Sequence, residues 1–276
     1  MNYRHAYHAG NFADVLKHAV LVWTVGYLQQ KEAPLCLIDT HGGAGLYDLT
    51  AGAALKTGEA AGGILRLAEA GARPAVLEPY LQLVARANDG EGITRYPGSP
   101  WLMGAMLRPR DRAVIGELHP EDAAALRATL SRFERVRVVE GDGYALLNRT
   151  VPPPEKRGLV LIDPPYEAVD EFETLAQAVI GAQAKWPTGA YLIWYPRKDL
   201  AAAERFHAEL MNARIAKMAT IEFSIGAGEM GLNACGLLLI NPPWTLEQEW
   251  RGPLSWLART LASGADADGQ VRWLAT

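Results

Sequence analysis

Short runs of consecutive apolar residues recur along the chain and predict buried β-strands. Within each run the apolar residues are continuous rather than alternating, as in strands whose sheet is covered on both faces. Five such runs lie at 35–39, 113–119, 136–142, 159–163 and 190–195. Segments with apolar residues at helical spacing follow three of these runs, at 121–133, 170–186 and 199–215. This alternation predicts an α/β fold with a mainly parallel sheet.

Three parts of the chain depart from the alternation. Residues 11–30 predict a helix before the first strand, and 219–226 with 235–243 predict an antiparallel hairpin near the C-terminus. Residues 46–98 are mostly Ala, Leu and Gly, are helical at 74–88 and show no convincing strand, so we expect a helical insertion subdomain. The expected organisation is an N-terminal segment with its helix (1–34), a core (35–45 and 99–276) and the insertion (46–98).

The composition is that of a globular protein. Apolar residues make up 49% of the 276 residues, enough for a packed core, yet no apolar run reaches the roughly 20 residues of a membrane helix. Both cysteines, Cys36 and Cys235, lie in apolar runs, as expected for reduced core thiols in the cytoplasm. Because the net charge is -4, any basic surface for a nucleic acid must be local.

A glycine-rich segment, THGGAG (residues 40–45), follows the first predicted strand. In open parallel sheets ligands bind beyond the carboxyl ends of the strands, and glycines there let the backbone approach a ligand closely. The spacing does not match Gly-x-Gly-x-x-Gly and lacks the Lys-Ser/Thr of a phosphate-binding loop. It therefore argues against a nicotinamide oxidoreductase. Taken alone, the segment is equally consistent with an ordinary strand–helix turn.

Acidic residues follow the next two predicted strands. Glu117 ends the second strand, where a carboxylate can accept hydrogen bonds from both hydroxyls of a ribose. Asp142 ends the third, where it can accept one from the exocyclic amine of an adenine. Each acid alone could be a helix cap or a solvated strand end. Together with the glycine-rich segment they indicate an adenosine-containing cofactor, and the lack of a phosphate-binding loop favours S-adenosyl-L-methionine.

The fourth predicted strand ends in Asp163-Pro164-Pro165-Tyr166. The exocyclic amine of adenine is a poor nucleophile, because its lone pair is delocalised into the ring. Asp163 can accept one amine hydrogen, and the carbonyl of Pro164, aimed by the fixed φ of the prolines, can accept the other. Tyr166 offers a face on which an extruded base can stack. These residues are the candidate catalytic residues, although a stiff turn would also explain two prolines.

A second motif of this kind, Asn241-Pro242-Pro243-Trp244, follows the last predicted strand. We do not assign it to the active site, because it follows the hairpin strand at the far edge of the predicted sheet. We expect it only to end that strand and to begin the segment after it.

The first eighteen residues combine cations with aromatic rings. Tyr3, Arg4 and Lys17 are candidates for contacts with RNA held partly out of a duplex. Because they precede the first strand, we expect them to lie outside the cofactor pocket. A polar helix start with capped histidines is the plainer interpretation. The three histidines of this segment lack a cysteine or a ligand-spaced partner, so we expect no metal site.

Residues 3–18, YRHAYHAGNFADVLKH, resemble the opening signature of the RlmJ family, whose members methylate N6 of an adenine in bacterial 23S ribosomal RNA. The segments DTHGGAG, GSPW, GELHP, EGDGY, DPPYE and NPPWTL also match this family in order. The resemblance covers essentially the whole chain. The family usually has Ala where Gly43 stands, a departure in the cofactor loop that we expect to be mild.

The resemblance implies a class I (Rossmann-like) methyltransferase fold with a C-terminal antiparallel hairpin. It implies that Asp163 is the proton acceptor and that Tyr3 lies near the RNA. It further implies cofactor contacts at His18, His41, Ser99, Glu117, Asp142, Gly143 and Asp163. We therefore expect a monomeric, metal-free, cytoplasmic enzyme that uses S-adenosyl-L-methionine to methylate an adenine of 23S ribosomal RNA.

Two other functions stay open from the residues themselves. One is another amino methyltransferase of the same fold, acting on guanine N2 of RNA or on adenine N6 of DNA; the N-terminal signature argues against it. The other is a catalytically inactive RNA-binding assembly protein, which the intact Asp163, Glu117 and Asp142 make a poorer explanation.

Overall fold

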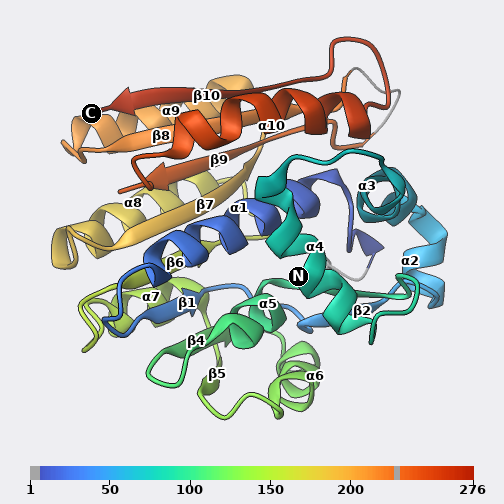
Figure 1. Ribbon diagram of the computed structural model, residues 1–276. Coiled ribbons are helices and arrows are strands. Elements are labelled where there is room, and N and C mark those ends of the chain that lie inside the picture. Colours follow the sequence, from blue (N-terminus) through green and yellow to red (C-terminus); the bar gives the residue numbers. More distant parts are fainter. Residues whose placement is uncertain (1–6, 227–230) are drawn as a thin grey trace.

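The computed structural model describes residues 7–226 and 231–276 of the chain (Figure 1). A single eight-stranded sheet runs through its centre in the order β10-β8-β9-β7-β6-β1-β4-β5. The strands are β1 (Cys36–Asp39), β4 (Arg112–Glu117), β5 (Val136–Glu140), β6 (Gly158–Ile162), β7 (Ala190–Pro196), β8 (Met218–Ser224), β9 (Ala234–Ile240) and β10 (Asp268–Ala275). All seven strands predicted from apolar runs are present.

The first five of these strands are parallel. β1 lies in the middle, between β4 and β6, and every one of its residues is buried. Because the strands are parallel, the carboxyl ends of β1, β4, β5 and β6 lie at one edge of the sheet. The segments that carry the glycines, the acids and Asp163 therefore start from this edge.

The last three strands complete the sheet on one side. β9 is antiparallel to both β7 and β8, which confirms the predicted hairpin. β10 pairs with β8 at the outer edge and was not expected, because its residues are only partly buried and carry no continuous apolar run. The fold is the expected Rossmann-like α/β fold with a C-terminal antiparallel part.

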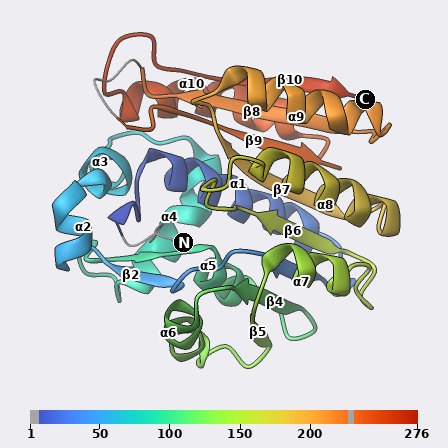
Figure 2. The ribbon, with the colours of Figure 1, turned by 180° about the vertical axis from the view of Figure 1, so that it is seen from behind.

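Helices cover both faces of the sheet, as Figures 1 and 2 show from opposite sides. The face nearer the viewer in Figure 2 carries α7 (Gly143–Thr150), α8 (Glu171–Lys185) and α9 (Leu200–Asn212). The other face carries α1 (Phe12–Gln29), α5 (Ser99–Met106), α6 (Pro120–Leu130) and α10 (Leu246–Leu261). Successive residues of β1 point to opposite faces of the sheet and so contribute to both cores. Leu37 packs in the core that contains α1, whereas Cys36 and Ile38 pack with α7 and α8 on the other face.

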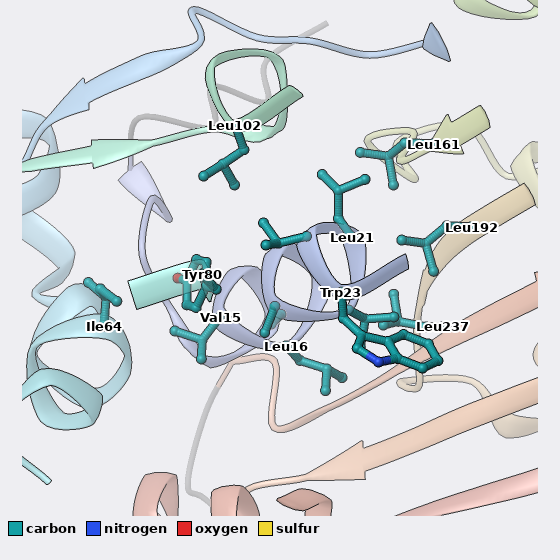
Figure 3. Close-up of a cluster of buried hydrophobic side chains, with 14 of the residues drawn as sticks. Val15, Leu16, Leu21, Trp23, Ile64, Tyr80, Leu102, Leu161, Leu192 and Leu237 are labelled. Atoms are coloured by element: carbon teal, nitrogen blue, oxygen red, sulfur yellow. The ribbon is translucent and has the colours of Figure 1, made fainter. Parts of the chain in front are cut away.

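The N-terminal helix α1 lies at the centre of the larger core. Its cap is Asn11, whose side chain accepts a hydrogen bond from the Asp14 backbone N–H at 2.9 Å. Every residue from Phe12 to Val25 is buried, as expected for a helix that is packed on all sides. Figure 3 shows Leu21 and Trp23 on the side of the sheet residues Leu161, Leu192 and Leu237, and Val15 near Ile64 and Tyr80 of the insertion.

The segment 46–98 begins and ends in strand. β2 (Leu46–Asp48) pairs with β3 (Arg95–Pro97) in an antiparallel ribbon, so the expectation that this segment contains no strand was wrong. Three-residue strands are too short to produce a recognisable alternating pattern. Between them lie α2 (Gly52–Thr57), α3 (Arg66–Glu69), α4 (Glu78–Ala87), a π-helix (Ala61–Leu65) and a 3-10 helix (Ala75–Leu77). The buried residues of these helices share a core with α1. No helix in the described ranges has the length and apolarity that crossing a membrane would require.

Candidate active site

A pocket of about 700 Å³ opens beyond the carboxyl ends of β1, β4 and β6. Its size is in the range of pockets that bind small molecules and cofactors. Its lining comes from α1, from the loops after these strands and from the insertion. Residues in or just after β7, β8 and α10 complete it. Of the residues predicted from the sequence, it contains Lys17, His18, His41, Ser99, Glu117, Asp163, Pro164 and Tyr166.

The glycine-rich loop after β1 forms one wall of this pocket. Gly43 has φ +60°, a left-handed conformation that favours glycine. A Cβ atom on Gly43 would lie 2.2 Å from the Tyr47 hydroxyl, which accepts a hydrogen bond from the Ala44 N–H at 3.2 Å. The loop is therefore built around Tyr47, and this explains why the position is glycine in this chain.

Glu117 lies directly against this loop. One carboxylate oxygen accepts the Gly43 N–H and the other accepts the His119 N–H, both at 2.7 Å. Its side chain is buried, and it contacts the pocket. A carboxylate offers about four lone-pair sites, so two further hydrogen bonds can be accepted here. The two backbone donors fix the direction in which those sites point.

Asp142 and Gly143 are placed differently from the other cofactor candidates. Asp142 caps α7 by accepting the Ala145 N–H at 2.7 Å, and neither residue is part of the pocket lining. A Cβ atom on Gly143 would lie 2.3 Å from the Thr40 carbonyl oxygen, so glycine is needed for the β5–α7 turn to pack against the loop after β1. Their contact with a cofactor stays a prediction.

Two histidines, His41 and His18, line the pocket. Burial lowers the pKa of His41 to about 4, so its ring is neutral at physiological pH. His18 is buried, and its Nδ1 lies 2.7 Å from the Tyr96 hydroxyl, which in turn lies 2.9 Å from the hydroxyl of Tyr80. This chain of contacts joins α1 to β3 and α4 of the insertion. It places the insertion at the pocket wall.

Asp39 is a buried carboxylate behind the pocket wall, and the sequence interpretation did not single it out. It ends β1, is fully buried, and accepts the His41 N–H at 3.1 Å and a hydrogen bond from Ser99. Burial raises the pKa of Asp39 to about 6. Its position at the end of the first strand was visible in the sequence, but nothing there distinguished it from a solvated strand end.

Asp163 is held by a cation on α1. Its Oδ2 lies 2.5 Å from the Lys17 ammonium, which also lies 2.9 Å from Asp14 Oδ1. Lys17 and Asp14 are almost completely buried, whereas the Asp163 side chain keeps 17% of its surface exposed. Burial alone would lower the pKa of Lys17, but the charges of Asp14 and Asp163 outweigh it and raise that pKa well above its ordinary value. The Oδ1 atom of Asp163 has no hydrogen bond within the described ranges.

This geometry changes the placement of Lys17. We expected it outside the cofactor pocket, and that expectation was wrong: Lys17 lies in the pocket wall, paired with Asp163. No local pattern in the sequence indicates this pair, because its members are 146 positions apart. Tyr3 and Arg4, the other two candidates for RNA contact, lie outside the described residues, and their role stays a prediction.

Tyr166 is fixed in an unusual backbone conformation. Its φ is +52°, which is uncommon for a residue with a side chain, and its hydroxyl donates to the Trp194 carbonyl at 2.7 Å. The ring contacts Phe172 and Trp194 at centroid distances of 5.0 and 5.7 Å. Burial raises the pKa of Tyr166 well above its ordinary value, so the phenol stays protonated. Together with Pro164 and Pro165 it forms the pocket wall next to Asp163.

The polar residues of the pocket are hydrogen-bond donors and acceptors. Within the ranges 7–226 and 231–276, no group of three or more His, Cys, Asp and Glu side chains is arranged to hold a metal ion. The arrangement instead combines a carboxylate fixed by backbone N–H groups with a second carboxylate fixed by an ammonium group. Such a site can bind one ligand through hydroxyl groups and position the amine of another.

Comparisons with known proteins agree on one family. The sequence model of the family described as ribosomal RNA large subunit methyltransferase D, RlmJ, matches residues 32–275. The chain is 37% identical to ribosomal RNA large subunit methyltransferase J of Escherichia coli over 276 residues, covering 99% of each chain. It is also 37% identical to the protein of the same name from Haemophilus influenzae, again over 99% of each chain. A crystal structure of a Legionella pneumophila protein superposes with a TM-score of 0.88 at 35% identity, covering 96% of this chain and 98% of that one.

Proposed function

The chain belongs to the RlmJ family of ribosomal RNA large subunit methyltransferases, and on that premise we propose that it transfers a methyl group from S-adenosyl-L-methionine to the N6 amine of an adenine in 23S ribosomal RNA. The observation that carries this proposal is that Glu117 and Asp163 line the same pocket. One carboxylate suits the ribose of a cofactor, and the other suits the amine of a target base. We further propose that the enzyme acts in the cytoplasm, as a monomer and without a metal ion.

The pocket residues fit this cofactor. Glu117 has free acceptor sites for the ribose hydroxyls, and its direction is set by the Gly43 and His119 N–H groups. Gly42 and Gly43 both line the pocket, and they let the loop pack closely on the protein behind it: a Cβ atom on Gly42 would lie 2.6 Å from Ile115. We propose that His18, His41, Ser99, Asp142, Gly143 and Asp163 complete the cofactor site. When bound, the cofactor supplies an electrophilic methyl group on a sulfonium sulfur.

Asp163 and Pro164 would position the target amine. The Lys17 ammonium occupies Oδ2 of Asp163, which leaves Oδ1 to accept one hydrogen from the adenine amine. The carbonyl oxygen of Pro164 would accept the other, so that the nitrogen lone pair is directed away from both acceptors. This alignment converts a poor nucleophile into a well-placed one, and much of the rate acceleration is expected to come from it.

Lys17 fixes the orientation of Asp163. The charge-assisted contact to Oδ2 holds the carboxylate in one position, so that Oδ1 faces the place of the target amine. Once the amine nitrogen has gained a methyl group it must lose a proton, and Asp163 Oδ1 is the acceptor that lies closest to it in this arrangement. The aromatic ring of Tyr166, held by its bond to the Trp194 carbonyl, would support the extruded base.

The experiment that tests this function compares substrates. Purified protein is incubated with labelled S-adenosyl-L-methionine and, separately, with 23S ribosomal RNA fragments, 16S ribosomal RNA and double-stranded DNA, and the modified nucleosides are identified by mass spectrometry. We expect N6-methyladenine in 23S fragments alone. N2-methylguanine, or methylation of DNA at a comparable rate, would identify a different amino methyltransferase. No methylation together with RNA binding would indicate an assembly protein.

A further inference from the structure

The two ends of the pocket differ in charge. The end next to the glycine-rich loop contains Glu117 and Asp122, and neither has a cationic partner within the described ranges. Arg66 and Lys198 lie on the other side: Lys198 follows β7, which β6 and β1 separate from β4, and Arg66 donates to the Ala262 carbonyl after α10. Neither has a carboxylate partner in the described ranges. The cofactor is a cation at its sulfur, whereas RNA is a polyanion. The charges therefore match cofactor at one end and RNA at the other.

The acids on the side of Arg66 and Lys198 already have partners. Asp14 lies 2.9 Å from the Lys17 ammonium, which it shares with Asp163 at 2.5 Å. Glu59, on the insertion, lies 2.8 Å from the His8 ring and also accepts a hydrogen bond from Asn11 at 3.0 Å. The hydrogen bond to Glu59 raises the pKa of His8 and favours its charged form. Neither Arg66 nor Lys198 forms a salt bridge with a carboxylate in the described ranges, so both cations of the pocket lining are available to an anionic ligand.

Arg66 and Lys198 come from different parts of the chain. Arg66 begins α3 of the insertion and donates one hydrogen bond to the Ala262 carbonyl at 2.7 Å, which fixes its position and leaves its other N–H groups available. Lys198 follows β7 and is exposed to solvent. The same pocket lining contains the apolar residues Trp194, Ile225, Leu232 and Leu261. A pocket lined by both apolar side chains and exposed cations suits a nucleotide, whose base can contact the apolar residues and whose phosphates can contact the cations.

We propose that Arg66 and Lys198 bind the backbone phosphates next to the extruded adenosine, so that the insertion forms one side of the RNA-binding cleft. The proposal rests on the function proposed above and extends it to the polynucleotide. It assigns to the segment 46–98 a role in substrate binding in addition to its packing against α1. It also places a basic surface on a chain whose net charge is -4.

The test measures RNA affinity as a function of salt concentration for Arg66→Gln, Lys198→Ala and Lys198→Glu. A 23S fragment that the wild-type protein methylates serves as the probe. Each lost phosphate contact should reduce the slope of log affinity against log salt by about 0.7 to 0.9. RNA affinity at low salt should fall roughly tenfold for each neutral variant and further for Lys198→Glu. Cofactor affinity, measured by calorimetry, should stay unchanged.

Arg137→Ala is the matched control. Arg137 is also an exposed arginine without a carboxylate partner in the described ranges, but it lies on β5, outside the catalytic pocket. It should leave slope, affinity and methylation rate as in the wild type. Thermal unfolding of each variant shows whether Arg66→Gln has disturbed the fold, and the exposed Lys198 gives an independent result if it has.

Three outcomes are distinguishable. If the Arg66 and Lys198 variants behave like Arg137→Ala while the wild type methylates RNA, the phosphate contacts are wrong and the proposed function stands. If the variants lose cofactor affinity instead, the two cations bind the carboxylate of the cofactor, and the proposal is again wrong. If the wild type neither binds nor methylates RNA, the proposed function itself fails, and the phosphate contacts fail with it.

Discussion

Two Pro-Pro motifs follow buried strands in this chain, and their surroundings are opposite. Asp163-Pro164 ends the parallel strand β6, next to the pocket and to Lys17. Asn241-Pro242 ends β9, which is antiparallel to β7, so its carboxyl end lies at the other edge of the sheet. There the Asn241 side chain donates to the Pro187 and Gly189 carbonyls, both at 2.8 Å.

The direction of the preceding strand, rather than the amino-acid sequence of the motif, determines which of the two motifs reaches the pocket. Both contain a left-handed residue, with φ +52° at Tyr166 and +51° at Asn241. Tyr166 lines the pocket, whereas Trp244 is 75% exposed and lies outside it. The asparagine motif connects β9 to the segment before β7. The aspartate motif presents a carboxylate to a ligand.

The largest expected effect distinguishes the two motifs directly. Asp163→Ala removes the acceptor for the target amine and should lower the methylation rate by about 10²–10³-fold or more. Single-turnover methylation of a 23S fragment measures this rate. In the matched variant Asn241→Ala, the rate should stay close to that of the wild type while the midpoint of thermal unfolding falls, because two hydrogen bonds are lost. An inactive but folded Asn241→Ala protein would contradict our choice of motif.

Lys17→Met should reduce both activity and stability. It leaves two carboxylates, Asp14 and Asp163, without their shared cation, and removing one partner of a buried ion pair costs about 3–5 kcal/mol. Denaturant unfolding measures the stability, and methylation assays below the unfolding transition measure the activity. The double variant Lys17→Met/Asp14→Asn should recover part of the stability, since one of the two unpaired charges is gone, but not the activity. Wild-type stability in the single variant would mean that the buried pair is not formed.

Glu117→Ala tests whether the same edge of the sheet binds the cofactor. The ribose hydroxyls would lose a charged acceptor, and each such hydrogen bond contributes about 1.5–3 kcal/mol. Cofactor affinity should therefore fall at least tenfold in calorimetry. Because Glu117 also holds the loop N–H groups, Glu117→Gln is the control: it keeps acceptor oxygen in place and should lose less affinity than alanine. Equal affinity in all three proteins would place the ribose elsewhere.

The smallest effect concerns the glycine loop. Gly43→Ala places a Cβ atom against the Tyr47 hydroxyl and strains a left-handed residue, so cofactor affinity should fall several-fold. Tyr47→Phe removes the hydroxyl, and the next Tyr47 atom is 3.5 Å from the Cβ position. The double variant Gly43→Ala/Tyr47→Phe should therefore bind the cofactor more tightly than Gly43→Ala alone. If the double variant is no better, backbone strain rather than the hydroxyl causes the loss.

Patterns along the chain predicted the sheet and the edge at which the site lies. Continuous apolar runs identified β1 and β4 to β9, and the residues near the ends of these runs included Glu117 and Asp163. Features that depend on distant partners were not predictable. The Lys17–Asp163 pair joins residues from α1 and the end of β6, and no local pattern signals it. The short β2–β3 ribbon and the partly exposed β10 give too few apolar residues to be recognised.

The central position of α1 has a consequence for biosynthesis. This helix leaves the ribosome long before its core partners Leu161, Leu192 and Leu237, which follow it by more than a hundred residues (Figure 3). The Trp23 indole donates to Glu249, 226 positions along the chain, at 2.8 Å. Until those partners are made, the apolar surface of α1 lacks its native contacts, a condition in which nascent chains aggregate or bind chaperones. The enzyme cannot complete the core around α1 until β9 and α10 have been translated.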